Sequence, residues 1–470
     1  NNSNRDFSNS IMSKIEVDAI DKQSGSTLTL GGSGTTVQLG TGASQTGFGR
    51  EGSVNWQTGS IKTTTFTAVS GEGYFVDTSS GAVTVNLPAG SAGAIVAFSD
   101  YTRTFGTNAL TITPNGSNKI GGVAANASLS VDGQAATFVF VDATEGWINV
   151  QNAEDTELGA TFISATGGTV TTACTNFKVH TFTGPGTFCV SSLGNVPANN
   201  EVSYIVVGAG AGGGWDRGGG GGAGGFRENK SGIDTYTASP LNGSTPITVT
   251  ATAFPITVGA GGVAGSPGAP TARGGTGGVS TFSTVTSAGG GGGGAANPSA
   301  PTGPGVAGAS GGGAGNRSGC GTMPGGAGNT PPVSPPQGNA GGPSVGPGPV
   351  APGGGGGGAT VAGTTATSSV GNGVTGGAGA TTNITGSPAA YAGGGGGGAS
   401  FCCGATCRTG GDGGTGGGGR GGNSPGGQAG TAGTANTGGG GGGGGNPSPS
   451  GPSLGGVGGS GVVIIRYKFQ

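Results

Sequence analysis

Apolar and polar residues alternate with a period of two through much of the first third of the chain. Between residues 61 and 152 the pattern runs through KTTTFTAV, YFVDT, AVTVNLP, AIVAFSD, ALTITP, ATFVFVD and GWINVQN, and Gly, Asp, Asn or Pro bound these segments. This period is typical of strands with one buried face. The sequence therefore predicts an all-β domain over residues 61–157.

The same alternation is sparser before this domain and returns after it. In residues 1–60, STLTL and TTVQL predict two short strands, which bury too little surface to stand alone. We expect them to associate with copies of themselves, as a homotrimer, or to dock on a larger particle. FKVHTF, GTFCV, EVSYIVV and the terminal GVVIIRYKF predict a β platform made of residues 158–207 and 462–470, which PITVTATAFPITVGAGG and VSTFSTVTSAGG broaden.

The stretch between the two parts of this platform, residues 208–461, carries most of the 121 glycines. Many stand in pure runs, such as those at residues 218–222, 289–294, 353–358, 393–398 and 438–445. One interpretation is a flexible coil, because glycine loses much backbone freedom on ordering and has no side chain to bury. The other is a bundle of polyglycine II helices, which have about three residues per turn and amides that point outward.

Three features favour the ordered bundle. In RGGTGGV (residues 273–279) and GGVGGS (residues 455–460) every third residue carries a side chain, which places these side chains on one edge of a threefold helix. Pure runs lack such an edge and suit helices with neighbours on all sides. Prolines between the runs mark turns. The predicted fold is thus all-β with an inserted polyglycine II bundle and no significant α-helix.

Charge and hydropathy exclude several classes of function. Only 8% of the 470 residues are charged and the net charge is -2, so we expect no surface for nucleic acid. No run of about 18 apolar residues occurs, and we expect no membrane insertion.

Six cysteines raise the question of disulfides or a metal. A hairpin centred on residues 184–186 would place Cys189 opposite residue 181, so a Cys174–Cys189 disulfide requires another strand arrangement. The other four cysteines could hold zinc, and three of them lie in FCCGATCR. They are Cys320, Cys402, Cys403 and Cys407. Loop disulfides or free thiols are favoured, because a second CxxC pair is missing and the chain has one histidine. No metal or cofactor is predicted.

Catalytic groups do not form a recognisable constellation. His180 lies in an alternating strand without a matched Ser or Asp partner, and we expect it to be structural. Turn chemistry explains the carboxylates at strand ends, namely Asp77, Asp100, Asp132 and Asp142. The glycine-rich stretch contains Asp216, Glu228, Asp234 and Asp412, none at the spacing of paired catalytic carboxylates. No GxxxxGK[ST] motif is present. We expect a protein that is not an enzyme.

Several segments carry a family likeness. SYIVVGAGAGGG, GGGGGAGGF, FPITVGAGG, TSAGGGGGGA and SGVVIIRY resemble the glycine-rich C-terminal domain of bacteriophage fibre proteins. The packed runs look like the polyglycine sandwich of tail-fibre tip adhesins from T-even-like phages. YFVDTSSGAVTVNLPAG through GWINVQN resembles a β domain frequent in phage tail fibres and tailspikes. The likeness covers residues 61–470 and leaves residues 1–60 as a fibre or attachment segment.

This resemblance implies a virion protein that attaches the phage to its host. Its partners would be other tail proteins and a host receptor, either a glycan or an outer-membrane protein, bound by variable loops at the end of the bundle. One alternative is a structural virion or cell-surface fibre without receptor binding. Another is an ice-binding protein, which would need a regular array of threonines, and the threonines here are scattered.

Antiparallel helices of similar length would place the loops that follow the glycine runs together at the far end of the bundle. These loops are residues 295–307, 359–370, 399–409 and 446–454. In SFCCGATCRT, Phe401 offers a stacking face and Arg408 a planar donor fork, although Phe401 could equally cap the bundle and Arg408 be solvated. Trp215 and Arg217 fit either end. The candidate receptor-binding residues are Phe401, Arg408, Trp215, Arg217, Asn297, Thr360 and Asn446.

Overall fold

The chain folds into two compact units, residues 1–157 and 158–470. The computed structural model describes residues 54–153, 160–268, 272–296, 302–316, 321–346, 351–367, 371–400, 408–424, 426–446 and 453–470. Over these ranges the secondary structure is almost entirely strand, and the helical element is one short 3-10 turn, η1 (Pro197–Asn200). The predicted all-β class is confirmed.

The first unit alternates between two sheets along the sequence. The five-stranded sheet has the order β1 (Asn55–Trp56), β3 (Glu72–Val76), β5 (Ile95–Asp100), β8 (Ala135–Phe140) and β9 (Trp147–Ala153). The four-stranded sheet has the order β2 (Phe66–Thr67), β4 (Val83–Asn86), β6 (Leu110–Thr113) and β7 (Ala127–Leu129). Strands β1, β3 and β5 run parallel, as do β2, β4 and β6. The chain therefore coils as in a β-solenoid before β7, β8 and β9 close it with antiparallel pairs.

The alternating pattern decides which side chains fill the core between these sheets. In β4 the buried residues are Val83 and Val85, and in β6 they are Leu110 and Ile112. The predicted turn role of the aspartates is also confirmed. For example, buried Asp100 accepts backbone hydrogen bonds from Phe105 and Gly133, both at 3.0 Å.

The platform of the second unit consists of two sheets that pack face to face. The first has the order β10 (Ser164–Thr166), β13 (Gly186–Ser192), β17 (Ala253–Thr257), β18 (Ser280–Phe282) and β19 (Val285–Ser287). The second has the order β11 (Thr169–Ala173), β12 (Phe177–Phe182), β24 (Val462–Lys468), β14 (Glu201–Val207) and β15 (Phe226–Asn229), with β16 (Ile247–Thr248) also paired to β14. Aromatic residues such as Phe188, Phe282 and Tyr204 fill the core between the two sheets.

The hairpin predicted around residues 184–186 is wrong. Strand β12 pairs with β11 and β24, whereas β13 pairs with β10 and β17, so the two strands belong to opposite sheets. Phe182 and Phe188 meet in the core between the sheets instead of across one hairpin. Cys174 and Cys189 are free thiols and exposed. The other four cysteines lie outside the described residues.

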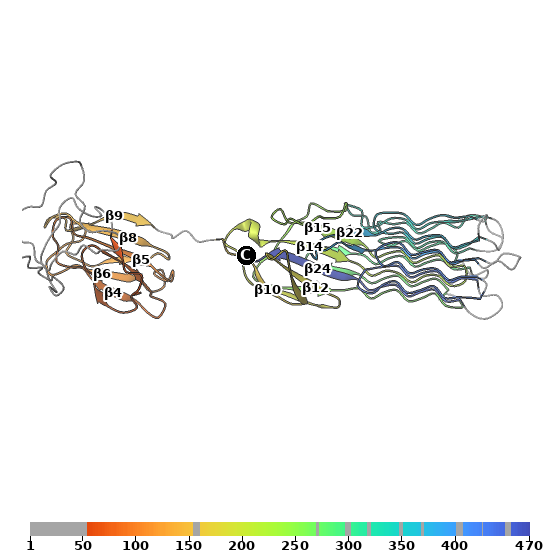
Figure 1. Ribbon diagram of the computed structural model, residues 1–470, viewed down its shortest axis with the longest axis horizontal. Helices are drawn as coiled ribbons and strands as arrows, with labels where there is room; N and C mark the ends of the chain where they lie inside the picture. Colours follow the sequence, from red (N-terminus) through yellow and green to blue (C-terminus); the bar gives the residue numbers. More distant parts are fainter. Residues whose placement is uncertain are drawn as a thin grey trace, which may run out of the picture. The chain divides into compact units, whose positions relative to one another are not determined.

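Strands β14 and β24 carry the glycine-rich region. They pair antiparallel up to Val207 and Val462, so the region leaves and re-enters the same sheet at neighbouring positions. Both strands are buried on both faces, which agrees with their mostly apolar sequences EVSYIVV and VVIIRYK. From here extended segments run side by side away from the platform (Figure 1). We call their described residues between 208 and 461 the glycine bundle.

Backbone hydrogen bonds join the segments of the glycine bundle, and their direction repeats every three residues. Three successive N–H groups donate to three different segments: Gly219 to Gly294, Gly220 to Gly354 and Gly221 to Gly441. The next three repeat this order: Gly222 to Gly291, Ala223 to Gly357 and Gly224 to Gly438. Carbonyls of the same run accept from three further segments: Gly219 from Gly214, Gly220 from Gly313 and Gly221 from Gly395. The run at residues 218–224 thus has six neighbouring segments, as we expected for pure glycine.

Segments at the surface of the bundle differ from this central run. In one segment Thr276 and Val279 are exposed three residues apart, and in another Leu454 and Val457 are. The exposed fractions of Val279 and Val457 are 44% and 48%. Within the bundle, four short strands form two-stranded sheets: β20 (Ser344–Val345) with β21 (Ala366–Thr367), and β22 (Ala380–Thr382) with β23 (Ala389–Tyr391).

Close packing leaves no space for side chains in the central runs. A Cβ atom on Gly395 would overlap the carbonyl oxygen of Gly441, whereas one on Gly232 would meet nothing within 4 Å. We expect Gly395→Ala to lower the free energy of unfolding by about 3 kcal/mol or more, because backbone on all sides resists relaxation. Gly232→Ala should change it by less than about 0.5 kcal/mol. Thermal unfolding followed by circular dichroism checks both, and equal melting temperatures would contradict the packed arrangement.

Candidate functional site

The segments of the glycine bundle turn at its far end, which we call the tip. One turn is formed by Trp215, Asp216 and Arg217, in which Asp216 and Arg217 have left-handed φ angles of 42° and 46°. Neighbouring segments hold this turn through the backbone. The N–H of Asp216 donates to the carbonyl of Ser453 at 3.2 Å, and its carbonyl accepts from Ala296 at 3.2 Å. Trp215 and Arg217, which the sequence could not assign to either end, lie at the tip.

Arg217 and Asp216 form an ion pair with two contacts. Nε of Arg217 lies 3.2 Å from Oδ1 of Asp216, and Nη2 lies 3.3 Å from Oδ2. Burial raises the pKa of Asp216, and the charge of Arg217 opposes this rise. The pair anchors a turn whose aromatic member, Trp215, is partly exposed.

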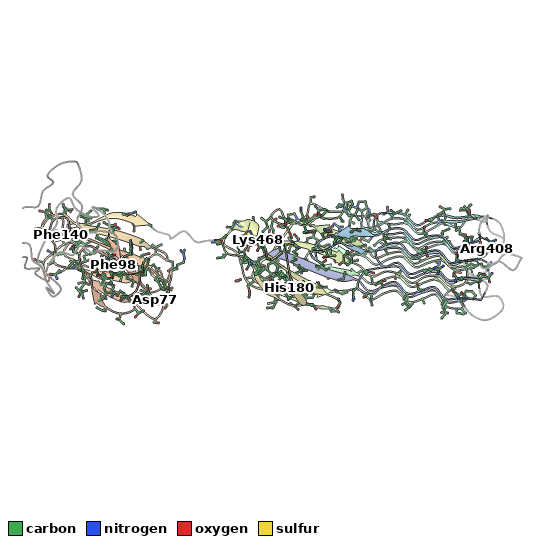
Figure 2. All side chains as sticks on the ribbon, viewed as in Figure 1. Asp77, Phe98, Phe140, His180, Arg408 and Lys468 are labelled. Atoms are coloured by element: carbon green, nitrogen blue, oxygen red, sulfur yellow. The ribbon has the colours of Figure 1, made fainter. Side chains whose placement is uncertain are left out.

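Two further candidates lie at the same end. The N–H of Asn446 donates to Ala399 at 3.0 Å, beside the bond from Arg217 to Gly445 at 3.4 Å. Figure 2 shows Arg408 at the end of the bundle far from Lys468 of the platform. Phe401 and Asn297 lie outside the described residues. The structure therefore brings Trp215, Arg217, Arg408 and Asn446 to one end, although they are distant in sequence.

Thr360 does not join this group. Its hydroxyl donates to the carbonyls of Ala378 and Gly379, at 3.1 and 3.0 Å, and the preceding Ala359 packs in a platform core with Phe226. The prediction that residues 359–370 form one tip loop is therefore wrong for its first residues. The prediction failed because the chain runs the other way here. The run at residues 353–358 is hydrogen-bonded antiparallel to the run at 393–398 and leads toward the platform. A pure run does not reveal its own direction.

A groove on the side of the bundle near the tip was not predicted. It has a volume of about 450 Å³ and is lined by Val263, Ala264, Ser266, Arg273, Gly274, Gly275 and Val306. Nε of Arg273 donates to the carbonyl of Thr302 at 3.2 Å, and burial lowers the pKa of its guanidinium. The sequence placed Arg273 on the outer edge of its segment, but the groove depends on neighbouring segments.

Comparison with known families is informative for both units. The model of a family described as "Glycine-rich domain" matches residues 183–468. The chain belongs to this glycine-rich domain family. A second model, described as "Bacteriophage T4 gp9/10-like protein, N-terminal", matches residues 22–143. Together the two matches support a phage tail fibre protein. A search of curated proteins gave no match.

Glu228 and Asp234 of this fibre protein have structural roles. Both oxygens of buried Asp234 accept from Nε of Arg466 in β24, at 3.0 and 3.1 Å, and Nη1 of Arg466 donates to the carbonyl of Ile384 at 3.1 Å. Glu228 accepts from the hydroxyls of Tyr236 and Thr382. These bonds tie loops of the glycine region to the platform. The match of residues 22–143 to a bacteriophage structural-protein model suggests a non-enzyme.

The residues that the structure describes contain no group of three or more His, Cys, Asp or Glu side chains that could hold a metal ion. The described helical structure includes no segment with the length and apolar character of a membrane span.

His180 is buried in the platform. Its Nδ1 lies 2.7 Å from the carbonyl oxygen of Gly167 and its Nε2 lies 3.2 Å from the hydroxyl of Tyr467. Burial lowers the pKa of His180, and the bond to Gly167 partly opposes this. The imidazole is therefore held neutral inside the fold.

We expect the free energy of unfolding to fall as the pH drops below about 6.5, the ordinary pKa of histidine. There the unfolded chain binds a proton at His180 that the folded chain binds only at lower pH. Denaturant unfolding between pH 7.5 and 5.5 measures the slope. Because His180 is the one histidine in the sequence, His180→Gln should flatten it in this window. An unchanged slope in that variant would refute the assignment.

Proposed function

We propose that this tail fibre protein attaches its phage to the host cell through the tip of the glycine bundle. The observation that supports this proposal is the gathering of Trp215, Arg217, Arg408 and Asn446 at one end. Apart from Arg217, which is paired with Asp216, these residues supply an indole, a guanidinium group and an amide. Proteins use such side chains to stack on sugars and aromatic groups and to bind acidic groups. The receptor would be a surface glycan or an outer-membrane protein.

We also propose that the segments of the bundle are polyglycine II helices. The three-residue repeat of the hydrogen bonds and the six neighbours of residues 218–224 support this, because a threefold helix directs successive amides about 120° apart. Such a stack is held by backbone in every lateral direction. It would act as a rigid support that carries the tip side chains at fixed spacing.

Removing the candidate side chains of one tip loop tests the receptor site. We expect Phe401→Ala combined with Arg408→Ala to reduce adsorption of the labelled protein to host cells at least tenfold, with an unchanged melting temperature. Thr360→Ala is the matched control, because this residue lies at the platform end of the bundle. Binding is measured by flow cytometry on a panel of candidate hosts. Full adsorption by the folded double variant would exclude this loop, and a fibre that serves structure alone would adsorb in no variant.

We further propose that the fibre protein is a homotrimer. Supporting this, the first unit exposes large apolar side chains: Trp56 is 38% exposed, and Tyr101 and Val150 are each 57% exposed. Packing such side chains against other copies would remove them from water.

Light scattering coupled to size exclusion should give three times the 43.4 kDa mass of one chain. We expect the combined Trp56→Ser and Tyr101→Ser changes to shift the mass toward one chain. A single-chain mass for the unmodified protein would contradict the trimer and favour docking of this unit on another tail protein.

A further inference from the structure

The charges of the glycine bundle are distributed unevenly. Its four acidic residues are all engaged: Asp216 with Arg217 at 3.2 Å, Asp412 with Arg420 at 3.3 Å, Asp234 with Arg466, and Glu228 with hydroxyl groups. Between Asp234 and Asp412 the sequence contains no other Asp or Glu, whereas it contains Arg273, Arg317 and Arg408. The charged residues in this long central part of the sequence are therefore all arginines.

Arg273 lies in the side groove near the tip. The groove is built by three segments: Val263 to Ser266 runs outward from β17, Arg273 to Gly275 returns toward β18, and Val306 belongs to a third. The backbone fixes these segments, since Gly275 donates to Val263 at 2.8 Å and Gly265 donates to Gly213 at 2.9 Å. Its volume of about 450 Å³ lies within the range of roughly 300–1,000 Å³ that small-ligand sites occupy.

The carbonyl group that holds the guanidinium of Arg273 also takes part in the backbone hydrogen bonds of the bundle. Its Nε donates to the carbonyl of Thr302, and the same carbonyl accepts from the N–H of Ala295. Thr302 is buried, so the acceptor that orients the guanidinium is fixed in place. A guanidinium oriented in this way is preorganised for a planar acidic group.

We propose that this groove binds an acidic sugar of the host surface, with its carboxylate or phosphate on Arg273. This rests on the proposed function and specifies the receptor class. Val263, which is 70% exposed, and Val306 offer apolar surface for the CH face of a sugar ring, and Ser266 offers a hydroxyl. A groove of this volume suits a small sugar ligand, whereas a protein receptor would need about 800 Å² of surface per partner.

Binding of purified oligosaccharides to the full chain tests this proposal. The probes are trigalacturonate, which carries carboxylates, mannose 6-phosphate, which carries a phosphate, and the neutral maltotriose. Isothermal titration should detect at least one of the acidic probes and not the neutral one. Affinity should fall at least tenfold between 50 and 500 mM salt, because the attraction is electrostatic.

Two groove variants and one matched control locate the site. Arg273→Gln removes the cation, and Val263→Asp places a negative charge at the rim without altering Arg273. Both should weaken binding of the acidic probe at least tenfold. Val457→Asp introduces the same charge on another surface segment, where Val457 is 48% exposed, and should bind as the unmodified chain does. Melting temperatures establish that each variant is folded.

Each outcome decides the proposal. Wild-type affinity in folded Val263→Asp, equal binding of the neutral probe, or binding of no acidic probe would overturn it. Equal losses in Val263→Asp and Val457→Asp would assign the effect to net charge and also overturn it. Adsorption to host cells distinguishes failure of the groove proposal from failure of the proposed attachment through the tip. If Val263→Asp adsorbs normally while the tip-loop double variant does not, the tip remains the receptor site and the groove is excluded.

Discussion

Hydrogen bonding between backbones that carry no Cβ atom is the interaction on which the second unit depends. In the run at residues 218–224, donors and acceptors reach six other segments, and this is possible because the segments approach as closely as bare backbone allows. Ordering each residue costs roughly 1–2 kcal/mol, and a hydrogen bond returns about 0.5–1.5 kcal/mol net. Hydrogen bonds by themselves therefore do not exceed the cost of ordering the backbone, and the bundle needs an anchor that is stable by other means.

The platform supplies that anchor through ordinary hydrophobic burial. Strands β14 and β24 are covered on both faces, one by the core around Phe188 and the other by the core around Phe226. Buried Arg466 on β24 pairs with Asp234 and stacks on Phe177, with its guanidinium carbon 4.4 Å from the ring centre. Removing either charge would leave the other buried without a partner, which would strongly destabilise the fold. The ion pair must therefore be kept as a pair. The platform thus fixes both ends of the glycine region.

This construction restricts where the fibre protein can vary in sequence. Inside the bundle a side chain would strike neighbouring backbone, and on its walls only the outward position of each turn is open, as at Val279 and Val457. Turns at the tip carry no such restriction, which is consistent with residues as different as Trp215 and Arg217 in one turn. In the groove, Arg273 occupies an outward position of its own segment and lies beside the edges of two other segments.

The sequence by itself determined the all-β class and most strand positions, because these follow from local periodicity. Segments such as FKVHTF and EVSYIVV coincide with β12 and β14, and the three-residue spacing of Thr276 and Val279 indicated an outer edge. Tertiary structure decided the rest. It placed β12 and β13 in opposite sheets, set the parallel order of the first unit and turned Thr360 toward the platform. Glycine runs are identical in either direction, so the end at which a loop emerges depends on how segments pair in space. The same holds for the groove at Arg273, whose walls come from segments that only the folded bundle brings together.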